Sequence, residues 1–194
     1  MKSQNDLSPK GENTRDRVLS FARDMLVDQG YDALVLRRIA EALDMKLSNV
    51  QYYFKTKDDL VAAIIESEEL YDIEVLREAL DRFEDGRDIV RYVLSKLLEH
   101  WRGSSGAIFR AREFFAWYKP AIHLTKKEND DLFFSLIERL VERLNPKLSK
   151  GEIKARRRLV VVVMDGGALS TDMGQRNKFT QALEDLIISI ATAD

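Results

Sequence analysis

Apolar side chains recur along almost the whole chain in steps of three or four residues, which is the spacing of an amphipathic helix. The strict two-residue alternation of a half-buried strand is absent. One stretch is ambiguous, because the four consecutive valines at 160–163 favour a strand on propensity. They lie within a segment of about twenty residues that opens with a capping box, and no partner strand is in view. We therefore predict an all-α protein.

Turn and cap residues divide the N-terminal part into a tail and four helices. Pro9 and Gly11 mark residues 1–12 as a loose tail, and Asn13 is a candidate N-cap for a first helix over 14–29. Gly30 is a natural left-handed terminator of that helix. A second, short helix carries Leu36, Ile39, Ala40 and Leu43, a third carries Val50 and Phe54, and a fourth starts after Thr56 and runs to about Leu80.

The remaining residues divide at Gly, Pro and Asn positions into five further helices. These are expected over 87–102, 106–118, 126–145, 152–171 and 178–192. Capping boxes are predicted for Thr125 with Glu128 and for Ser149 with Glu152. The predicted organisation is a tail over 1–12, a three-helix domain over 13–56 and a larger helical domain over 57–194, with about nine helices in all.

Composition narrows the class of protein. The 194 residues are 45% hydrophobic and 33% charged, as in ordinary globular proteins. We find no apolar stretch long enough for a secretion signal or a membrane span, so we expect a cytoplasmic protein without a membrane partner. The chain has no cysteine, which excludes disulfides and thiolate chemistry. The charge distribution argues only weakly for or against nucleic-acid binding. Residues 1–57 hold ten Lys/Arg and eight Asp/Glu, while the whole chain has a net charge of −2.

Catalytic patterns are missing. The two histidines, His100 and His123, have no spacing that suggests a metal site or a catalytic triad, and GxSxG, Walker and Rossmann glycine patterns are absent. We expect neither an enzyme nor a cofactor or metal site.

Residues 30–60 have the pattern of a helix-turn-helix. Ile39, Ala40 and Leu43 form the inner face of a support helix, and the small Ala40 lets the next helix cross closely. Val50 and Phe54 bury that next helix. The positions left facing outward are Leu47, Ser48, Asn49, Gln51 and Tyr52. This short, polar and aromatic set suits reading of the DNA major groove.

The segment resembles the helix-turn-helix of TetR-family regulators. The features that carry the resemblance are Gly30-Tyr31, Ile39-Ala40, the Tyr52-Tyr53-Phe54 block, and Lys57 followed by Leu60. By motif the resemblance covers residues 14–65; beyond them only length and helix count agree. It implies base contacts by Arg37, Leu47, Ser48, Asn49 and Gln51, and phosphate contacts by Tyr52, Tyr53 and Lys57. Arg can bond guanine bidentately, and Asn and Gln can bond adenine.

The chain also departs from the family pattern. Asp44 stands where a turn glycine is usual, which is tolerable because Asp enters the left-handed region more readily than most residues. Leu34-Val35 and Lys46 stand where Ser/Thr caps are usual, so two helices are expected to lack a standard cap. Gln51 replaces a commonly aromatic residue. These departures concern individual contacts rather than the motif.

The resemblance implies a ligand-responsive repressor that binds a quasi-palindromic double-stranded DNA operator as a homodimer. The alternative is an all-helical small-molecule-binding or adaptor protein without specific DNA binding. The expected effector is a small, largely apolar molecule in the larger domain. The candidate pocket residues are His100, Trp101, Phe109, Glu113, Phe114, Trp117 and Met164. The aromatic residues among them fit a hydrophobic core as well as a pocket, and both interpretations stay open.

The last two predicted helices carry apolar faces that a monomer would leave exposed. Gly166-Gly167 would let a partner backbone approach closely. We therefore predict a two-fold dimer through a four-helix bundle. The candidate interface residues are Leu159, Val163, Gly166, Gly167, Phe179, Leu183, Leu186 and Ile190.

Two kinds of charge cluster are explained without a functional role. Arg156-Arg157-Arg158 invites a second nucleic-acid patch, but three successive helical residues spread around the helix, which favours a solvated face or local ion pairs. The pairs Asp58-Asp59, Glu68-Glu69 and Asp130-Asp131 are expected to be capping or surface charges.

Overall fold

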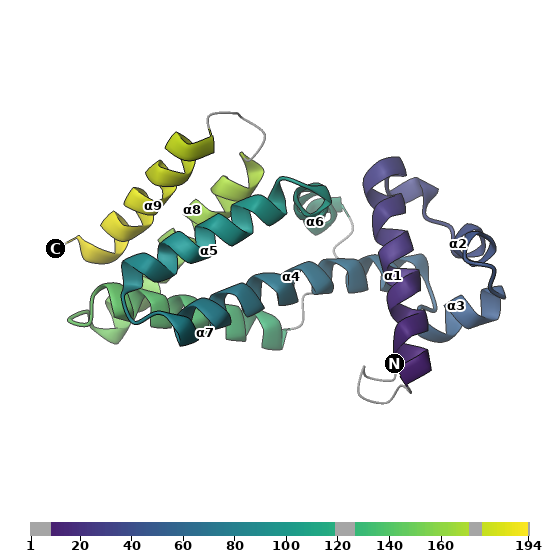
Figure 1. Cartoon of the computed structure of the whole chain (residues 1–194), viewed down its shortest axis with the longest axis horizontal. Helices are drawn as coiled ribbons and strands as arrows, with labels where there is room; N and C mark the ends of the chain where they lie inside the picture. The colour runs from purple at the N-terminus through teal and green to yellow at the C-terminus, as the bar shows by residue number, and fades with distance from the viewer. Residues whose placement is uncertain (1–8, 119–126, 171–175, 194) are drawn as a thin grey trace. The chain divides into compact units, whose positions relative to one another are not determined.

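The computed structural model describes residues 9–118, 127–170 and 176–193, except for the side chains of 9–12, 113–114, 116–118 and 176–177. The all-α prediction is confirmed for this part of the chain, which contains nine α-helices and one short 3₁₀ helix (Figure 1). The elements are α1 (Pro9–Gln29), η2 (Tyr31–Ala33), α2 (Leu36–Ala42), α3 (Leu47–Tyr53), α4 (Lys57–Arg82), α5 (Gly86–Trp101), α6 (Ser104–Tyr118), α7 (Lys127–Leu144), α8 (Lys150–Leu169) and α9 (Arg176–Thr192). None of the described helices combines the length and apolar character needed to cross a bilayer.

The backbone packs into two compact units, residues 1–67 with 111–124, and residues 68–110 with 125–194. Helices α4 and α6 each contribute residues to both units. In the first unit α1 packs against α2 and α3, and α2 packs against α3 (Figure 1). Its buried apolar residues include Val18, Ala22, Leu34, Ile39, Ala40, Val50, Phe54, Leu60 and Ile64.

The start of α1 differs from the prediction. The helix begins at Pro9, so Asn13 lies inside it and is not its N-cap. Proline suits the first helical position, because its fixed φ is already helical and its missing N–H is not needed there. The prediction took Pro9 and Gly11 as features of a loose tail and overlooked this use of proline.

Two turns of the first unit use residues with positive φ. Gly30, which follows α1, has φ 79° and ψ 175°, a region that glycine alone occupies readily. Asp44, between α2 and α3, has φ 53° and is the one positive-φ residue other than glycine among the described residues. The left-handed conformation expected for Asp44 is therefore confirmed.

Helix caps follow the sequence signals closely. Thr56 Oγ1 accepts from the N–H of Asp59, and Asp59 Oδ2 accepts from the N–H of Thr56, at 3.0 Å each. Ser149 and Glu152 form the predicted capping box, and these hydrogen bonds lower the pKa of Glu152. Val35 and Lys46 make no side-chain cap, as expected from their identity. The predicted box at Thr125 lies outside the described residues.

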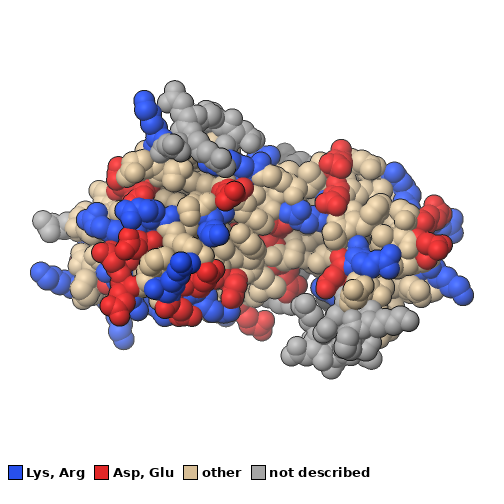
Figure 2. All heavy atoms as spheres, viewed as in Figure 1, with Lys and Arg blue, Asp and Glu red and all other residues tan. Residues whose placement is uncertain are grey.

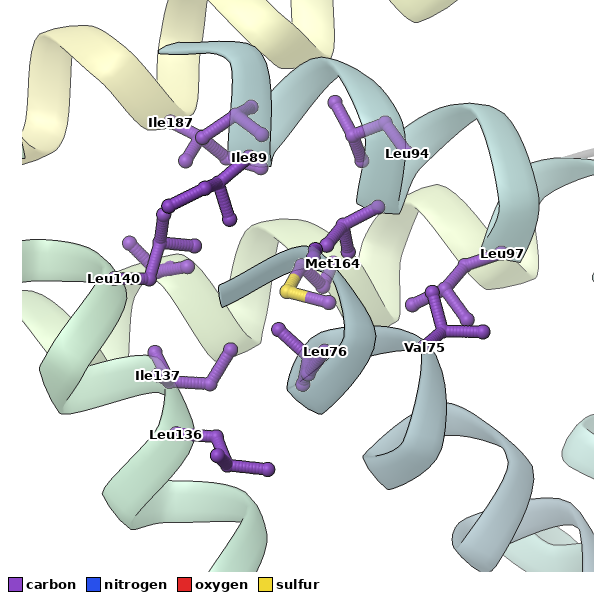
Figure 3. Packing of buried hydrophobic residues seen from close by; sticks show 14 of the residues in the cluster. Val75, Leu76, Ile89, Leu94, Leu97, Leu136, Ile137, Leu140, Met164 and Ile187 are labelled. Atoms are coloured by element: carbon purple, nitrogen blue, oxygen red, sulfur yellow. The ribbon is translucent and has the colours of Figure 1, made fainter. Parts of the chain in front are cut away.

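The second unit is built around α5, which packs against α7, α8 and α9. Its core is a continuous cluster of mostly aliphatic side chains, in which Leu76, Leu97 and Ile137 are fully buried (Figure 3). The four valines lie within α8, so the helical interpretation of 160–163 is confirmed. Gly86 is required for packing, because a Cβ there would lie 2.8 Å from Leu144 Cγ.

The three consecutive arginines of α8 serve different purposes. Arg156 Nη1 donates to the carbonyl oxygens of Ile190 and Ala191, at 3.1 and 2.9 Å, near the end of α9. Arg157 Nη1 lies 2.7 Å from Glu138 Oε1, and its guanidinium lies over the ring of Phe134. Two of the three arginines are therefore structural, which agrees with local pairing rather than a second nucleic-acid patch.

The turn at Asp44 gives a stability prediction. Asp44→Val should lower the free energy of unfolding by about 1–2 kcal/mol, because a β-branched residue is strained at positive φ. Asp44→Gly should change it by less than about 1 kcal/mol, since relief of strain is offset by a more flexible unfolded chain. Urea unfolding measures both. Glu41→Val removes the same charge from an exposed site in α2 and should cost only about 0.5 kcal/mol of helix propensity. Equal losses for the two valine variants would contradict strain at Asp44.

Candidate nucleic-acid interface

Helix α3 has one buried side and one exposed side. Val50 is fully buried and Phe54, its C-cap residue, is 2% exposed. Ser48, Asn49, Gln51 and Tyr52 are exposed, while Leu47 and Tyr53 are half-buried. The side chains predicted to face outward therefore share one accessible face, apart from the partial burial of Leu47.

The turn before α3 fixes the direction of that face. The N–H of Met45 donates to the carbonyl of Ala40 at 2.8 Å, and the N–H of Asn49 donates to the carbonyl of Lys46 at 2.9 Å. Ala40 is 2% exposed, which is consistent with the close crossing predicted for a small residue. Backbone bonds and burial hold α3 in place where side-chain caps are missing.

The two tyrosines of α3 support each other. Tyr52 is 60% exposed, and its ring meets that of Tyr53 edge to face, with 5.0 Å between centroids. Of the three aromatic residues Tyr52, Tyr53 and Phe54, only Phe54 is therefore buried in the hydrophobic core. A tyrosine in this position presents a hydroxyl that can donate to a phosphate oxygen.

The two arginines of α2 have different roles. Arg38 donates to the carbonyl of Ala33 and to Gln29 Oε1, both at 3.1 Å, and so ties α2 to the end of α1 and to η2. Arg37 is exposed. Arg38 is exposed as well, but its guanidinium is engaged in these two bonds, which agrees with the choice of Arg37 as the candidate base reader.

Lys57 begins α4 and rests on an aromatic ring. Its Nζ lies 3.6 Å from the centroid of the Tyr31 ring, and the Tyr31 hydroxyl donates to Asp58. Sequence reasoning selected Lys57 but missed Tyr31 as its partner. Tyr31 follows Gly30 within the recognised motif, so the residue itself could have been singled out from the sequence. Its contact with Lys57 could not, because the two residues are 26 positions apart and helical periodicity relates only near neighbours.

The described candidate pocket residues are mostly core. Trp101, Phe109 and Met164 are at most 7% exposed and belong to the hydrophobic cluster of the second unit. For these three the structure favours core packing over a pocket wall. The side chains of Glu113, Phe114 and Trp117 lie outside the described residues.

His100 belongs to a part-buried polar group of the second unit. Its Nε2 lies 2.7 Å from Glu68 Oε2, its Nδ1 lies 3.5 Å from Ser105 Oγ, and its ring stacks on Tyr71. Burial, followed by the nearby carboxylates of Asp72 and Glu99, raises the pKa of Tyr71. The Glu68 side chain is only 16% exposed, so the expectation of a surface charge is wrong for Glu68. Glu68 on the long α4 is part-buried beside its histidine partner.

Helix α8 carries two apolar stripes. One includes Ile153, Val160, Met164 and Ala168 and is buried in the unit's own core. The other contains Ala155, Leu159, Val162, Gly166 and Leu169, which are exposed and recur in steps of three or four. Of its larger side chains, Leu159, Val162 and Leu169, Val162 is the most exposed at 66%, and Leu186 on α9 is 47% exposed.

Several predicted interface residues lie elsewhere. Leu183 is 8% exposed, and a Cβ on Gly167 would lie 3.0 Å from Leu183 Cδ1. These two residues pack inside their own chain, so their assignment to an exposed dimer face is corrected. Val163, Phe179 and Ile190 are half-buried. Helical spacing identified the apolar faces. It could not distinguish the stripe that is buried in the chain's own core from the stripe that is exposed.

Basic and acidic side chains are mixed on the visible face of the molecule, where they are interspersed over both units (Figure 2). Among the described residues, no group of three or more His, Asp and Glu side chains is placed to hold a metal ion.

Comparisons with known proteins agree with this geometry. Residues 18–64 match the model of the bacterial regulatory proteins of the TetR family. The chain is 45% identical over 49 residues to an uncharacterized HTH-type transcriptional regulator in the dhlA 5′ region of Xanthobacter autotrophicus. It is 32% identical over 57 residues to the HTH-type transcriptional regulator QacR of Staphylococcus aureus. These alignments cover 25% and 29% of this chain and span only 24% and 30% of the two relatives.

The similarity in fold extends further than the similarity in sequence. A TetR transcription regulator from Haloarcula marismortui superposes with a TM-score of 0.73, covering 93% of this chain and 97% of that one at 18% identity. At this identity the match shows the fold alone. The family model is therefore matched by residues 18–64 alone, while the fold of the chain is that of a solved TetR transcription regulator.

Proposed function

We propose that this protein is a ligand-responsive transcriptional repressor that binds a quasi-palindromic DNA operator as a dimer. The observation that carries the proposal is the division of α3, in which Val50 and Phe54 are buried while Asn49 and Gln51 are exposed. A short helix held in this way can enter the major groove with its polar side facing the base edges. The matched family domain supports the same conclusion.

The exposed residues have the chemistry for distinct contacts. Asn49 and Gln51 can each bond the N6 and N7 atoms of adenine, and Arg37 can bond guanine bidentately. Tyr52, Tyr53 and Lys57 supply donors for phosphate oxygens, which orient the domain without reading sequence. Leu47 and Ser48 complete the proposed base-reading set, Leu47 through apolar contact with a thymine methyl group.

Dimerisation is proposed through the exposed stripe of α8 and the exposed part of α9. Leu159, Val162 and Leu169 would form the apolar centre, and the exposed Gly166 would allow close approach of a partner helix. Leu186 extends this surface onto α9. A two-fold axis through it would present two copies of α3 to two half-sites about 34–36 Å apart, or somewhat more.

An effector can release DNA only if it binds one conformation of the protein more tightly than another. We propose that it binds within the second unit, where the group of His100, Glu68 and Tyr71 offers polar recognition in a unit with an apolar core. A largely apolar molecule with one polar group fits this combination.

The alternative is an all-helical binding or adaptor protein that uses the N-terminal helices only for packing. Titration of the purified protein with fragmented host DNA at several salt concentrations separates the two functions. A regulator should show affinity that falls steeply with salt, because phosphate contacts release counterions. Absence of binding at low salt would favour the adaptor function.

Lys57 is expected to contact phosphate. Lys57→Ala should weaken binding to all DNA sequences alike and reduce the slope of log affinity against log salt by about one. The slope can be measured by fluorescence anisotropy. Lys96→Ala removes the same charge from the exposed face of α5 and should leave the slope unchanged. Equal slopes for the Lys57 variant and the wild type would exclude Lys57 from the interface.

Asn49 and Gln51 are expected to read bases. Replacing either by Ala should weaken binding to the best operator by about 1–3 kcal/mol and relax the preference at one base position. Selection of bound fragments from a randomised operator library reports both effects. The contrast with Lys57→Ala, which should preserve every base preference, is the internal control. An unaltered preference in both variants would show that α3 does not read these bases.

The exposed stripe gives a prediction for assembly. Val162→Glu and Leu186→Glu should produce folded monomers with much weaker operator binding, because each places a charge in the proposed apolar interface. Leu70→Glu, at an exposed apolar site on α4, is the matched control and should remain dimeric. Leu183→Glu should instead destabilise the fold, since Leu183 is buried. Light scattering that finds a monomeric wild type at micromolar concentration, or dimeric Val162 and Leu186 variants, would contradict this interface.

A further inference from the structure

Arg15, near the start of α1, lies over the end of α3. Its Cζ atom is 5.4 Å from the centroid of the Phe54 ring, and Phe54 is the C-cap residue of α3. Phe54 is 2% exposed, whereas the Arg15 side chain is 21% exposed. Arg15 therefore covers a core ring and still has part of its own surface in solvent.

We propose that Arg15 binds a DNA phosphate beside the C-terminal end of α3, so that α1 takes part in DNA binding. The proposal rests on the proposed function and adds to it one anion-binding residue outside the helix-turn-helix. Neither the helical pattern nor the family resemblance assigned a role to Arg15.

The first step concerns the donors of Arg15. A guanidinium group carries five N–H donors, and its attraction to an aromatic ring leaves those donors able to bond elsewhere. In the described structure Arg15 pairs with Asp16, whose Oδ1 lies 3.8 Å from Arg15 Nη1, a distance too long for a hydrogen bond. The Asp16 side chain is 65% exposed, so water weakens this ion pair further. A phosphate oxygen can therefore compete for the guanidinium, because it would form stronger, charge-assisted hydrogen bonds.

The second step concerns the charge at the end of α3. The last carbonyl groups of a helix lack intrahelical partners and carry partial negative charge, which repels a phosphate. Helix α3 has no basic residue in its last turn that would offset this charge. Arg15 supplies a positive charge at that end from a neighbouring helix. The proposed phosphate donors Tyr52 and Tyr53 belong to the same turn, so a cation beside it favours their contacts as well.

The third step concerns distance. Helix α3 spans Leu47–Tyr53, which is about 10 Å by the helical rise, and the major groove is about 12 Å wide. A helix of this length in the groove has its ends close to the sugar-phosphate backbones that border the groove. A guanidinium beside one end of α3 is therefore within reach of a phosphate.

The fourth step concerns how firmly Arg15 is held. Helix α1 packs against α3, and Val18, three residues after Arg15 on the same side of α1, is fully buried. A guanidinium that already lies over Phe54 has less rotamer freedom left to lose when it binds. Arg17 differs, because it is exposed and lies about 200° around the helix from Arg15. It is the matched control for a charge on α1 that faces away from α3.

The salt dependence of binding tests the contact. The probe is the genomic DNA fragment that the wild type binds most tightly, measured by fluorescence anisotropy at several salt concentrations. Arg15→Gln should weaken binding about three- to tenfold and reduce the slope of log affinity against log salt by about one. Arg15→Lys, which keeps the charge, should retain the wild-type slope, and so should the control Arg17→Gln. A wild-type slope in Arg15→Gln, or an equal reduction in Arg17→Gln, would overturn the proposal.

A second neutral variant separates phosphate binding from packing. Arg15→Met keeps an apolar chain over Phe54 but has neither charge nor donor. If Arg15 binds phosphate, Arg15→Met should lose as much slope as Arg15→Gln while unfolding at nearly the wild-type urea concentration. If Arg15 only packs on Phe54, Arg15→Met should bind DNA with the wild-type slope, and that result would overturn the proposal.

The failure of this contact can be told apart from the failure of the proposed function. If the wild type binds no DNA at low salt, both are overturned. If Lys57→Ala reduces the slope while both neutral Arg15 variants keep it, the function stands and the Arg15 contact alone fails. If both hold, Arg15→Gln combined with Lys57→Ala should reduce the slope by about two, because the two cations would contact different phosphates.

Discussion

The whole N-terminal site depends on the burial of two side chains from a seven-residue helix. A helix as short as α3 has almost no stability alone, because nucleation costs more than its few hydrogen bonds return. Its missing N-terminal side-chain cap makes this worse. The packing of Val50 and Phe54 against α1 and α2 therefore decides both whether α3 exists and which side faces out. The exposure of Asn49 and Gln51 is a consequence of that burial.

Much of this arrangement could be predicted from the sequence. The helices after α1 begin and end within a few residues of the positions expected from Gly, Pro and capping residues, because those signals act locally. The outward side of α3 also follows from local periodicity, since burial of Val50 leaves few choices for its neighbours. The positive φ of Asp44 was predictable because one turn position demanded it.

What could not be predicted depends on contacts between distant residues. Glu68 was expected at the surface, but it is part-buried and pairs with His100, 32 residues later. Leu183 and Leu186 both belong to the apolar face predicted for the last helix, yet the first is packed against Gly167 and the second is exposed. Helical spacing gives the direction of a side chain relative to its own helix axis. It does not say which neighbour, if any, will cover that side.

The arginines of α8 illustrate how the kind of contact governs tolerance to sequence change. Arg156 bonds to backbone carbonyls of Ile190 and Ala191, which any side chains at those two positions would still provide. Arg157 instead bonds to the side chain of Glu138, so a change in either partner leaves the other charge half-buried. In diverging descendants of this gene, positions 138 and 157 should therefore covary. Position 156 should stay arginine while positions 190 and 191 drift independently of it.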